Sequence, residues 1–294
     1  MKKALLIINP SAGKTKSKTH FFTVAKALSD GDIQPTVFVT REQGDATEKV
    51  KAEGAFYDLI VCCGGDGTLN ETVNGLLSLP AQDRRPLGYV PCGSTNDFAA
   101  ALGIPLKPEN AAALIAAGKT KRIDAGCFNG RFFTYVASFG AFTSVSYDTP
   151  QQVKNSLGHF AYILEGAKAL GTIHPYEMEY DCDGVKGRGQ FIFGAVSNTT
   201  SIGGIYKLPK KEVSLTDGEF ELLLLQDPFS SPETLWNIVH RKLDSDENIV
   251  FLHGKQITLR AEGAIPFTLD GEFGGNTSLA RISCLPGAVE FLCQ

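Results

Sequence analysis

The stretch that decides the fold is the apolar run at residues 59–63 followed by Gly64-Gly65-Asp66-Gly67-Thr68-Leu69-Asn70-Glu71. The run predicts a buried strand, and the periodicity behind it predicts a helix over residues 69–77. Three glycines in four positions permit backbone torsions and close approaches that a Cβ would block. The N–H groups of such a loop, together with the positive end of the next helix, form a seat for phosphate. The sequence therefore predicts a nucleotide-binding strand, loop and helix.

The same alternation continues on both sides of this loop. Further strands are predicted at residues 4–8, 36–40 and 87–90, and further helices at residues 19–29, 46–53, 96–102 and 109–117. Strands that alternate with helices form a parallel sheet covered by helices, and ligands bind at the carboxyl ends of its strands. We expect residues 1–125 to form an α/β domain with its ligand site at that edge.

From residue 126 the pattern changes to strands separated by turns. The predicted strands lie at residues 131–138, 176–180, 189–197, 220–226, 255–261 and 288–293. Asp-Gly turn signals stand at residues 183–184, 217–218 and 270–271, and two helices are predicted near residues 158–170 and 232–240. This pattern favours a mainly antiparallel β-sandwich over residues 126–294, with a last strand that can pack back toward the first domain.

Composition narrows the class of protein. The chain has 294 residues, 43% of them hydrophobic and 20% charged, which is enough for one large domain or two ordinary ones. Its net charge of −4 argues against a general nucleic-acid binder. Seven scattered cysteines without a C-x-x-C pair favour a reducing cytosol. No apolar run approaches the roughly 20 residues of a spanning helix, so we expect only peripheral membrane contact.

Two more polar loops follow predicted strands. One is Asn9-Pro10-Ser11-Ala12-Gly13-Lys14, which either binds phosphate through its lysine or is an ordinary turn with a serine cap. The other is Pro91-Cys92-Gly93-Ser94-Thr95-Asn96-Asp97-Phe98-Ala99, which either binds phosphate or only caps a helix. In the central loop, Asp66 can hold a Mg²⁺–nucleotide complex or a ribose, and Thr68 and Asn70 can bond phosphate; the alternative there is a turn with an Asp cap.

Together these motifs resemble the diacylglycerol kinase family of bacterial soluble lipid kinases. The resemblance includes the three loops, with Ser94 where the family usually has threonine, and Thr40 followed by Gly44-Asp45-Ala46. It continues through Ile123-Asp124-Ala125-Gly126, Leu157-Gly158-His159-Phe160-Ala161-Tyr162, Asn198 with Gly203-Gly204, and residues 213–220. In that last segment, Thr216 replaces the first Asp of the family's D-D-G turn.

The resemblance implies an NAD-kinase-like, ATP-binding domain at residues 1–125 and a lipid-substrate domain at residues 126–294. It implies that ATP is bound by Asn9, Pro10, Ser11, Ala12, Gly13, Thr40, Gly64, Gly65, Asp66, Gly67, Thr68, Leu69, Asn70, Glu71, Gly93, Ser94, Asn96 and Asp97.

Catalytic and metal-binding roles are implied for the remaining motifs. In Leu269-Asp270-Gly271-Glu272, which as bare sequence is another turn, the resemblance makes Glu272 the general base, with Asp124 and Lys14 in support. It makes Asp217 the ligand of a structural Mg²⁺, completed by carbonyls near Ser214 and Glu219 and by waters. The alternative for Asp217-Gly218 is a plain hairpin turn.

We therefore expect a cytoplasmic, peripherally membrane-associated kinase that uses ATP and Mg²⁺ to phosphorylate a lipid alcohol, most simply diacylglycerol to phosphatidic acid. An isoprenoid alcohol, a sphingoid base or phosphatidylglycerol would need a similar apolar groove. One alternative is an NAD kinase or another G-G-D-G-T kinase of a soluble substrate, and a second is a non-catalytic family member. The expected partner is lipid at the membrane surface rather than nucleic acid, and a homodimer is possible.

Overall fold

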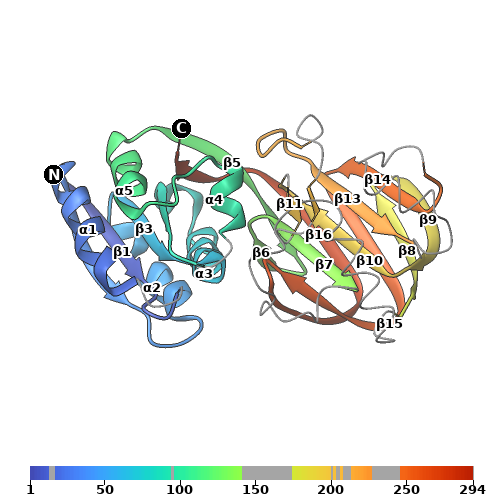
Figure 1. The fold of residues 1–294 in the computed structure, drawn as a ribbon. Helices are drawn as coiled ribbons and strands as arrows, with labels where there is room; N and C mark the ends of the chain where they lie inside the picture. Colours follow the sequence, from blue (N-terminus) through green and yellow to red (C-terminus); the bar gives the residue numbers. More distant parts are fainter. Residues whose placement is uncertain are drawn as a thin grey trace. The chain divides into compact units, whose positions relative to one another are not determined.

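The computed structural model describes residues 1–12, 17–93, 96–140, 174–199, 201–202, 206–207, 213–226 and 246–293. The chain divides into two compact units, drawn in Figure 1. Unit 1 comprises Met1–Ala125, Arg131–Thr134 and Pro286–Gln294, and unit 2 comprises Gly126–Gly130 and Tyr135–Leu285. Strands β5 (Thr120–Phe128) and β16 (Glu272–Leu292) contribute residues to both units.

Unit 1 is built on a parallel sheet, as the alternating sequence pattern predicts. Its central strands are β1 (Lys2–Ile8), β2 (Ile33–Val39), β3 (Leu59–Gly64) and β4 (Leu87–Pro91). The sheet order is β4-β3-β1-β2, and the end of β16 adds to β4 in parallel where Phe291 pairs with Leu87. Every residue of β3 and β4 is buried, as expected for strands covered on both faces. The carboxyl ends of β1, β3 and β4 therefore meet at one edge of the sheet.

Helices connect these strands. They are α1 (Ser17–Asp30), α2 (Asp45–Glu53), α3 (Asp66–Leu77), α4 (Asp97–Ala101) and α5 (Pro108–Ala117), with single 3₁₀ turns at Gly54–Phe56 and Ala81–Asp83. α1 packs against α5, and α2 packs against α3. Helix α3 begins three residues earlier than the sequence predicts, because the Leu69 N–H already bonds the Gly65 carbonyl.

Unit 2 is mainly antiparallel, which confirms the predicted fold class. Its strands are β7 (Val136–Gly140), β8 (Tyr176–Cys182), β9 (Val185–Phe191), β10 (Phe193–Ser197), β13 (Phe220–Leu225), β14 (Ile249–Gly254) and β15 (Gln256–Leu269). They follow the order β14-β13-β10-β7-β15-β16, and the β8–β9 hairpin adds to the first half of β15. Two short strands, β11 (Ser201–Ile202) and β12 (Tyr206–Lys207), also belong to unit 2, whereas the short strand β6 (Arg131–Phe133) belongs to unit 1.

Strand β15 changes partner along its length. Its first half pairs with β8, its last residues pair with β7, and its register to β16 shifts between Arg260 and Ile265. Such an irregularity bends a strand, so one strand can serve two parts of a folded sheet. The rings of Phe128 and Phe139 pack on Phe267 of β15, with centroids 4.9 and 5.5 Å away, and form part of the unit 2 core.

Two predicted strands are each divided in the structure. The segment predicted at residues 131–138 forms two strands, β6 and β7. Tyr135 lies between them and Val136 begins β7, and the N–H groups of both residues donate to the Asp270 carboxylate, which interrupts the strand pairing. The segment predicted at residues 189–197 forms β9 and β10, because the chain changes partners at Ile192, whose N–H bonds Leu225. The sequence pattern did not predict β5 or β14. The helices predicted near residues 158–170 and 232–240 lie outside the described residues.

Two of the three Asp-Gly signals form tight hairpin turns. Asp183-Gly184 and Asp270-Gly271 have positive φ at both residues, the geometry of a type I′ turn. Asp217-Gly218 differs, because only the glycine has a positive φ. No helix in the described ranges is long and apolar enough to cross a membrane.

Candidate active site

The first and central loops of unit 1 are bonded to each other. Asn9 directly follows β1, and its Nδ2 donates to the buried Thr68 Oγ1 at 2.9 Å, while its Oδ1 accepts from the Ser11 N–H at 2.9 Å. The Asn9 N–H donates to the Cys63 carbonyl at 3.0 Å. Ser11 is exposed and Ala12 is buried beneath the turn. Asn9 therefore links the first loop to β3 and to the first turn of α3, on either side of Gly65. Gly13 and Lys14 lie outside the described residues.

The central and third loops touch backbone to backbone. A Cβ built on Gly93 would lie 2.7 Å from the Gly65 Cα, and one built on Gly64 would lie 2.6 Å from the Thr68 Cβ. Both distances are too short for a real Cβ. Glycine is therefore required at residue 93 for the contact between the two loops, and at residue 64 for the contact with Thr68. Gly65 precedes α3 and provides no side-chain cap, so the helix presents N–H groups of its first turn without such a cap. Uncapped N–H groups at the start of a helix are what a phosphate seat of the predicted kind would need.

The third loop closes on Asn96. This residue has φ 54° and is buried, and its side chain both accepts from the Gly93 N–H and donates to the Gly93 carbonyl, each at 2.9 Å. The Tyr89 hydroxyl also reaches Asn96 Oδ1 at 3.4 Å. Burial, and then the nearby Asp66 carboxylate, raise the pKa of Tyr89 well above its usual value. Asn96 thus shapes the loop, whereas Ser94 and the Asp97 side chain lie outside the description.

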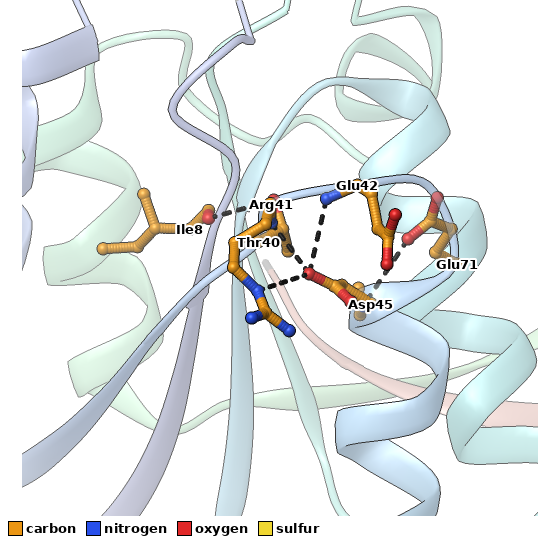
Figure 2. Close-up of polar contacts among 7 residues, drawn as sticks. Ile8, Thr40, Arg41, Glu42, Asp45 and Glu71 are labelled. Atoms are coloured by element: carbon orange, nitrogen blue, oxygen red, sulfur yellow. Dashed lines mark hydrogen bonds and ion pairs between the residues drawn. The ribbon is translucent and has the colours of Figure 1, made fainter.

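Glu71 holds the start of α2. Its carboxylate accepts from the Gly44 N–H at 2.9 Å and from the Ala46 N–H at 3.4 Å, as Figure 2 shows in part. Gly44 itself has φ 93°, which favours glycine. The same contacts place the predicted Thr40–Ala46 segment beside the central loop. Glu71 therefore caps a neighbouring helix, a role that its sequence motif alone did not indicate.

Asp45 organises the turn between Thr40 and α2. Its Oδ2 accepts from the Arg41 N–H at 2.8 Å and the Glu42 N–H at 3.4 Å, and the Arg41 guanidinium lies 3.6 Å away (Figure 2). The Arg41 backbone hydrogen bond chiefly lowers the pKa of Asp45. Thr40 is buried, and both its N–H and its hydroxyl bond the Ile8 carbonyl, at 2.9 and 3.3 Å. Thr40 is thereby fixed at the carboxyl edge of the sheet.

Two other predicted residues make structural bonds within unit 1. The Asn70 and Asn74 amides donate to the Phe132 carbonyl at 3.4 and 2.9 Å, which ties β6 to α3. Asp124 is 2% exposed, and its Oδ1 accepts from the Gly287 N–H at 2.6 Å. Asp124 thus attaches the returning C-terminal segment to unit 1.

The candidate base lies on a firmly anchored turn in unit 2. Glu272 is exposed and begins β16. Two residues earlier, Asp270 is 3% exposed, and its Oδ1 accepts from the N–H groups of Tyr135 and Val136 at 2.9 and 3.1 Å. An exposed carboxylate on a turn fixed by a buried one can orient an alcohol and accept its proton. Asp270 therefore fixes the turn that carries Glu272, a structural role that the sequence did not reveal.

The candidate metal residues form a small turn before β13. Asp217 Oδ1 accepts from the Glu219 N–H at 3.1 Å, and the Ser214 hydroxyl accepts from the Thr216 N–H at 3.3 Å. In the described ranges no three His, Cys, Asp or Glu side chains converge on one point, so a cation here would depend largely on carbonyls and waters.

A third carboxyl group, that of Glu221, lies close to this turn in the chain. The buried Glu221 carboxylate has no hydrogen-bond partner within the described chain. Burial, and then Asp217 and Glu219, raise its pKa to about 9. With this pKa the Glu221 carboxyl is neutral near pH 7, so the charge for a cation would come from Asp217 and Glu219, which reach the surface. Oxygen donors of this kind suit Mg²⁺, so the residues present fit such an ion.

Comparison with known proteins gives the same picture for both halves. The model named "Diacylglycerol kinase catalytic domain" matches residues 3–128, and that named "YegS C-terminal NAD kinase beta sandwich-like domain" matches residues 136–293. The chain is 36% identical over 282 residues to a diacylglycerol kinase of Bacillus subtilis (strain 168), covering 94% of this chain and 91% of that protein. It is 32% identical over 279 residues to one of Staphylococcus aureus (strain MRSA252), covering 93% and 87%.

Solved structures are similar over the whole length. The crystal structure of a putative diacylglycerol kinase from Bacillus anthracis str. Sterne superposes with a TM-score of 0.83 at 28% identity, covering 100% of this chain and 97% of that one. Another structure described in the same terms gives a TM-score of 0.82 at 27% identity, with the same coverage.

Proposed function

Since the chain belongs to the diacylglycerol kinase family, we propose that it transfers the γ-phosphate of ATP to the hydroxyl of diacylglycerol and yields phosphatidic acid. The observation that carries this proposal is the joining of the three loops at the carboxyl ends of β1, β3 and β4, beside the N-terminus of α3. Such an arrangement suits a nucleoside triphosphate.

The sites then divide between two regions. Residues 1–125 form the ATP-binding domain, and residues 126–294 form the lipid-substrate domain. The ATP ligands would include Thr40, the backbone of Gly64, Gly65 and Gly93, and the Asp66 carboxylate, with Asn9, Thr68, Asn96 and Glu71 holding the loops in place. A phosphate seat made chiefly of backbone groups needs rigid neighbours, and these side chains supply them.

Glu272 would perform the proton transfer. Its carboxylate accepts the hydroxyl proton as the lipid oxygen attacks the γ-phosphorus, and the bond from phosphorus to the ADP oxygen breaks. Lys14 and the first-turn N–H groups of α3 neutralise the charge on the transferred group, and Asp124 supports the site by fixing the C-terminal segment. When bound, Mg²⁺ supplies further charge neutralisation at the phosphates, near Asp66. A second Mg²⁺ would be held by Asp217 with carbonyls near Ser214 and Glu219, and would stabilise the turn before β13.

The experiment is a panel of acceptors with labelled ATP: diacylglycerol, an isoprenoid alcohol, a sphingoid base, phosphatidylglycerol and NAD. Diacylglycerol should be labelled, and labelling of NAD alone would instead support a kinase of a soluble substrate. Glu272→Gln should reduce kcat by about 10²- to 10⁴-fold with ATP binding unchanged. The matched control is Glu262→Gln, which alters an exposed glutamate on β15. Full activity of Glu272→Gln refutes the assignment of the base, and no labelled acceptor at all favours a non-catalytic member.

Because the proposed substrate is a membrane lipid, the protein would be cytoplasmic and would bind the membrane peripherally. We also propose that it forms a homodimer. Phe273, the residue after Glu272, is 64% exposed and can enter the lipid surface. Co-sedimentation with vesicles that contain diacylglycerol should fall for Phe273→Ser, and unchanged sedimentation refutes this mode of docking. Light scattering of the purified chain determines the oligomeric state.

A further inference from the structure

Two cysteines meet directly beneath the nucleotide loops. Cys63 lies at the end of β3, next to Gly64, and Cys92 follows β4, next to Gly93. Their sulfur atoms are 3.4 Å apart, although 29 residues separate them in the chain. They lie on the same face because Cys63 pairs with Val90, two residues before Cys92, and side chains on a strand repeat every two residues.

The two thiols are not equivalent. Cys63 is 5% exposed, whereas Cys92 is half-buried and more accessible to a small reagent. One hydrogen bond joins the two sulfur atoms, and either thiol can donate it. This bond lowers the pKa of Cys92, whereas the same bond and burial raise the pKa of Cys63. The accessible sulfur is therefore also the one that ionises first, which is the usual distribution in a reactive pair.

We propose that Cys63 and Cys92 form a reversible disulfide that is a redox modification site at the base of the nucleotide loops. The oxidant is a hydroperoxide. The Cys92 thiolate attacks a peroxide oxygen, the O–O bond breaks, and Cys92 becomes a sulfenic acid. The Cys63 sulfur then attacks the Cys92 sulfur, the S–O bond breaks, and hydroxide leaves and takes up the Cys63 proton as water. Two electrons pass from the sulfur atoms to the peroxide, which for hydrogen peroxide ends as two waters.

The disulfide should change the conformation of the two loops because their backbones are already in contact. A disulfide is about 2.05 Å long, so the two sulfur atoms must approach by roughly 1.4 Å. The Cys92 N–H already bonds the Gly64 carbonyl at 2.7 Å, and Gly65 and Gly93 are already in backbone contact. The strand ends therefore carry the closure into both loops. The resulting loss of turnover rests on the proposed function, whereas formation of the disulfide does not.

The first test detects the bond itself. The reduced protein is treated with hydrogen peroxide, digested without reductant and analysed by mass spectrometry for a peptide that links residues 63 and 92. The link should form in the wild type and in Cys62→Ala, whose cysteine occupies the opposite face of β3, and dithiothreitol should remove it. In Cys63→Ala, Cys92 should stop at sulfenic acid, which dimedone captures. Absence of the link in the wild type overturns the proposal, and so does absence of the dimedone adduct on Cys92.

The second test measures the consequence. Peroxide should lower kcat/KM for ATP at least about tenfold in the wild type and in Cys62→Ala, with recovery after dithiothreitol, and should change it much less in Cys63→Ala. Each variant is compared with its own reduced form. If the linked peptide forms but turnover is unchanged, the coupling to the loops is refuted. If no acceptor is phosphorylated even by the reduced protein, the proposed function fails. Mass spectrometry of the linked peptide would still show whether the disulfide forms.

Discussion

Two Asp-Gly turns in this chain differ chiefly in burial, and this makes the contribution of Asp270 measurable. Asp270 and Asp183 both begin type I′ turns, and each carboxylate accepts two backbone N–H groups. Asp270 is buried, and Asp183 is exposed. Replacement of either by alanine removes two hydrogen bonds from backbone N–H groups to a carboxylate. Because water can reach the amides only at residue 183, Asp270→Ala should be the more destabilising change.

The magnitude follows from the two bonds. A hydrogen bond to a charged group contributes about 1.5 to 3 kcal/mol, so Asp270→Ala should cost about 3 kcal/mol or more, because it leaves two amides buried without partners. Asp183→Ala should cost about 1 kcal/mol or less, since its amides gain water. At about 2 to 4 °C per kcal/mol, the melting temperature should fall by about 6 to 12 °C and by at most about 4 °C, respectively. Asp270→Asn keeps an acceptor oxygen and should lie between these values.

Thermal unfolding followed by far-ultraviolet circular dichroism is a sufficient assay. All three variants are measured in the same buffer with a reductant, beside the wild type. If Asp270→Ala and Asp183→Ala melt within about 2 °C of each other, burial does not strengthen the Asp270 bonds and the reasoning is refuted.

Three further predictions follow from unit 1. Glu71→Ala should destabilise the protein to urea by about 1 to 3 kcal/mol because two amides at the start of α2 lose their acceptor, whereas Glu48→Ala, on the exposed surface of the same helix, should cost about 0.5 kcal/mol or less. If Glu71→Ala and Glu48→Ala unfold at the same urea concentration, Glu71 does not cap α2. Gly93→Ala should lower kcat/KM for ATP at least about tenfold because its Cβ meets the Gly65 backbone, and Gly263→Ala, with open space around it, should not. Burial raises the pKa of Cys62 to about 12, so its thiol stays neutral in the folded chain while it ionises in the unfolded chain above about pH 9. The stability that this neutral thiol contributes is complete below about pH 9 and is lost toward about pH 12. The free energy of unfolding of the wild type should therefore fall by about 2 kcal/mol relative to that of Cys62→Ala between about pH 8.5 and about pH 10.5. If urea titrations show the same difference between the two proteins at both pH values, the thiol is not held neutral by burial.

The candidate site was only partly predictable from sequence. The G-G-D-G pattern predicted a glycine-dependent loop before a helix, and Gly64 of that pattern occupies a position where a Cβ does not fit. The motif could not show that Glu71 caps α2, because its partner Gly44 lies 27 residues earlier. In a sequence, a carboxylate next to a glycine-rich loop suggests ligand binding. Only the hydrogen-bond partners that the folded chain brings to it show whether it caps a helix instead.

The sequence by itself determined the local structures and the fold class. Glycine and aspartate at positions of positive φ specify turns through short-range sterics, and the alternation of strands and helices specifies a parallel sheet through the need to bury both faces. Tertiary structure decided which distant groups meet. Cys63 contacts Cys92, and Asp270 accepts from Tyr135, 135 residues away. Such contacts depend on strand order and register, which the local sequence pattern does not encode.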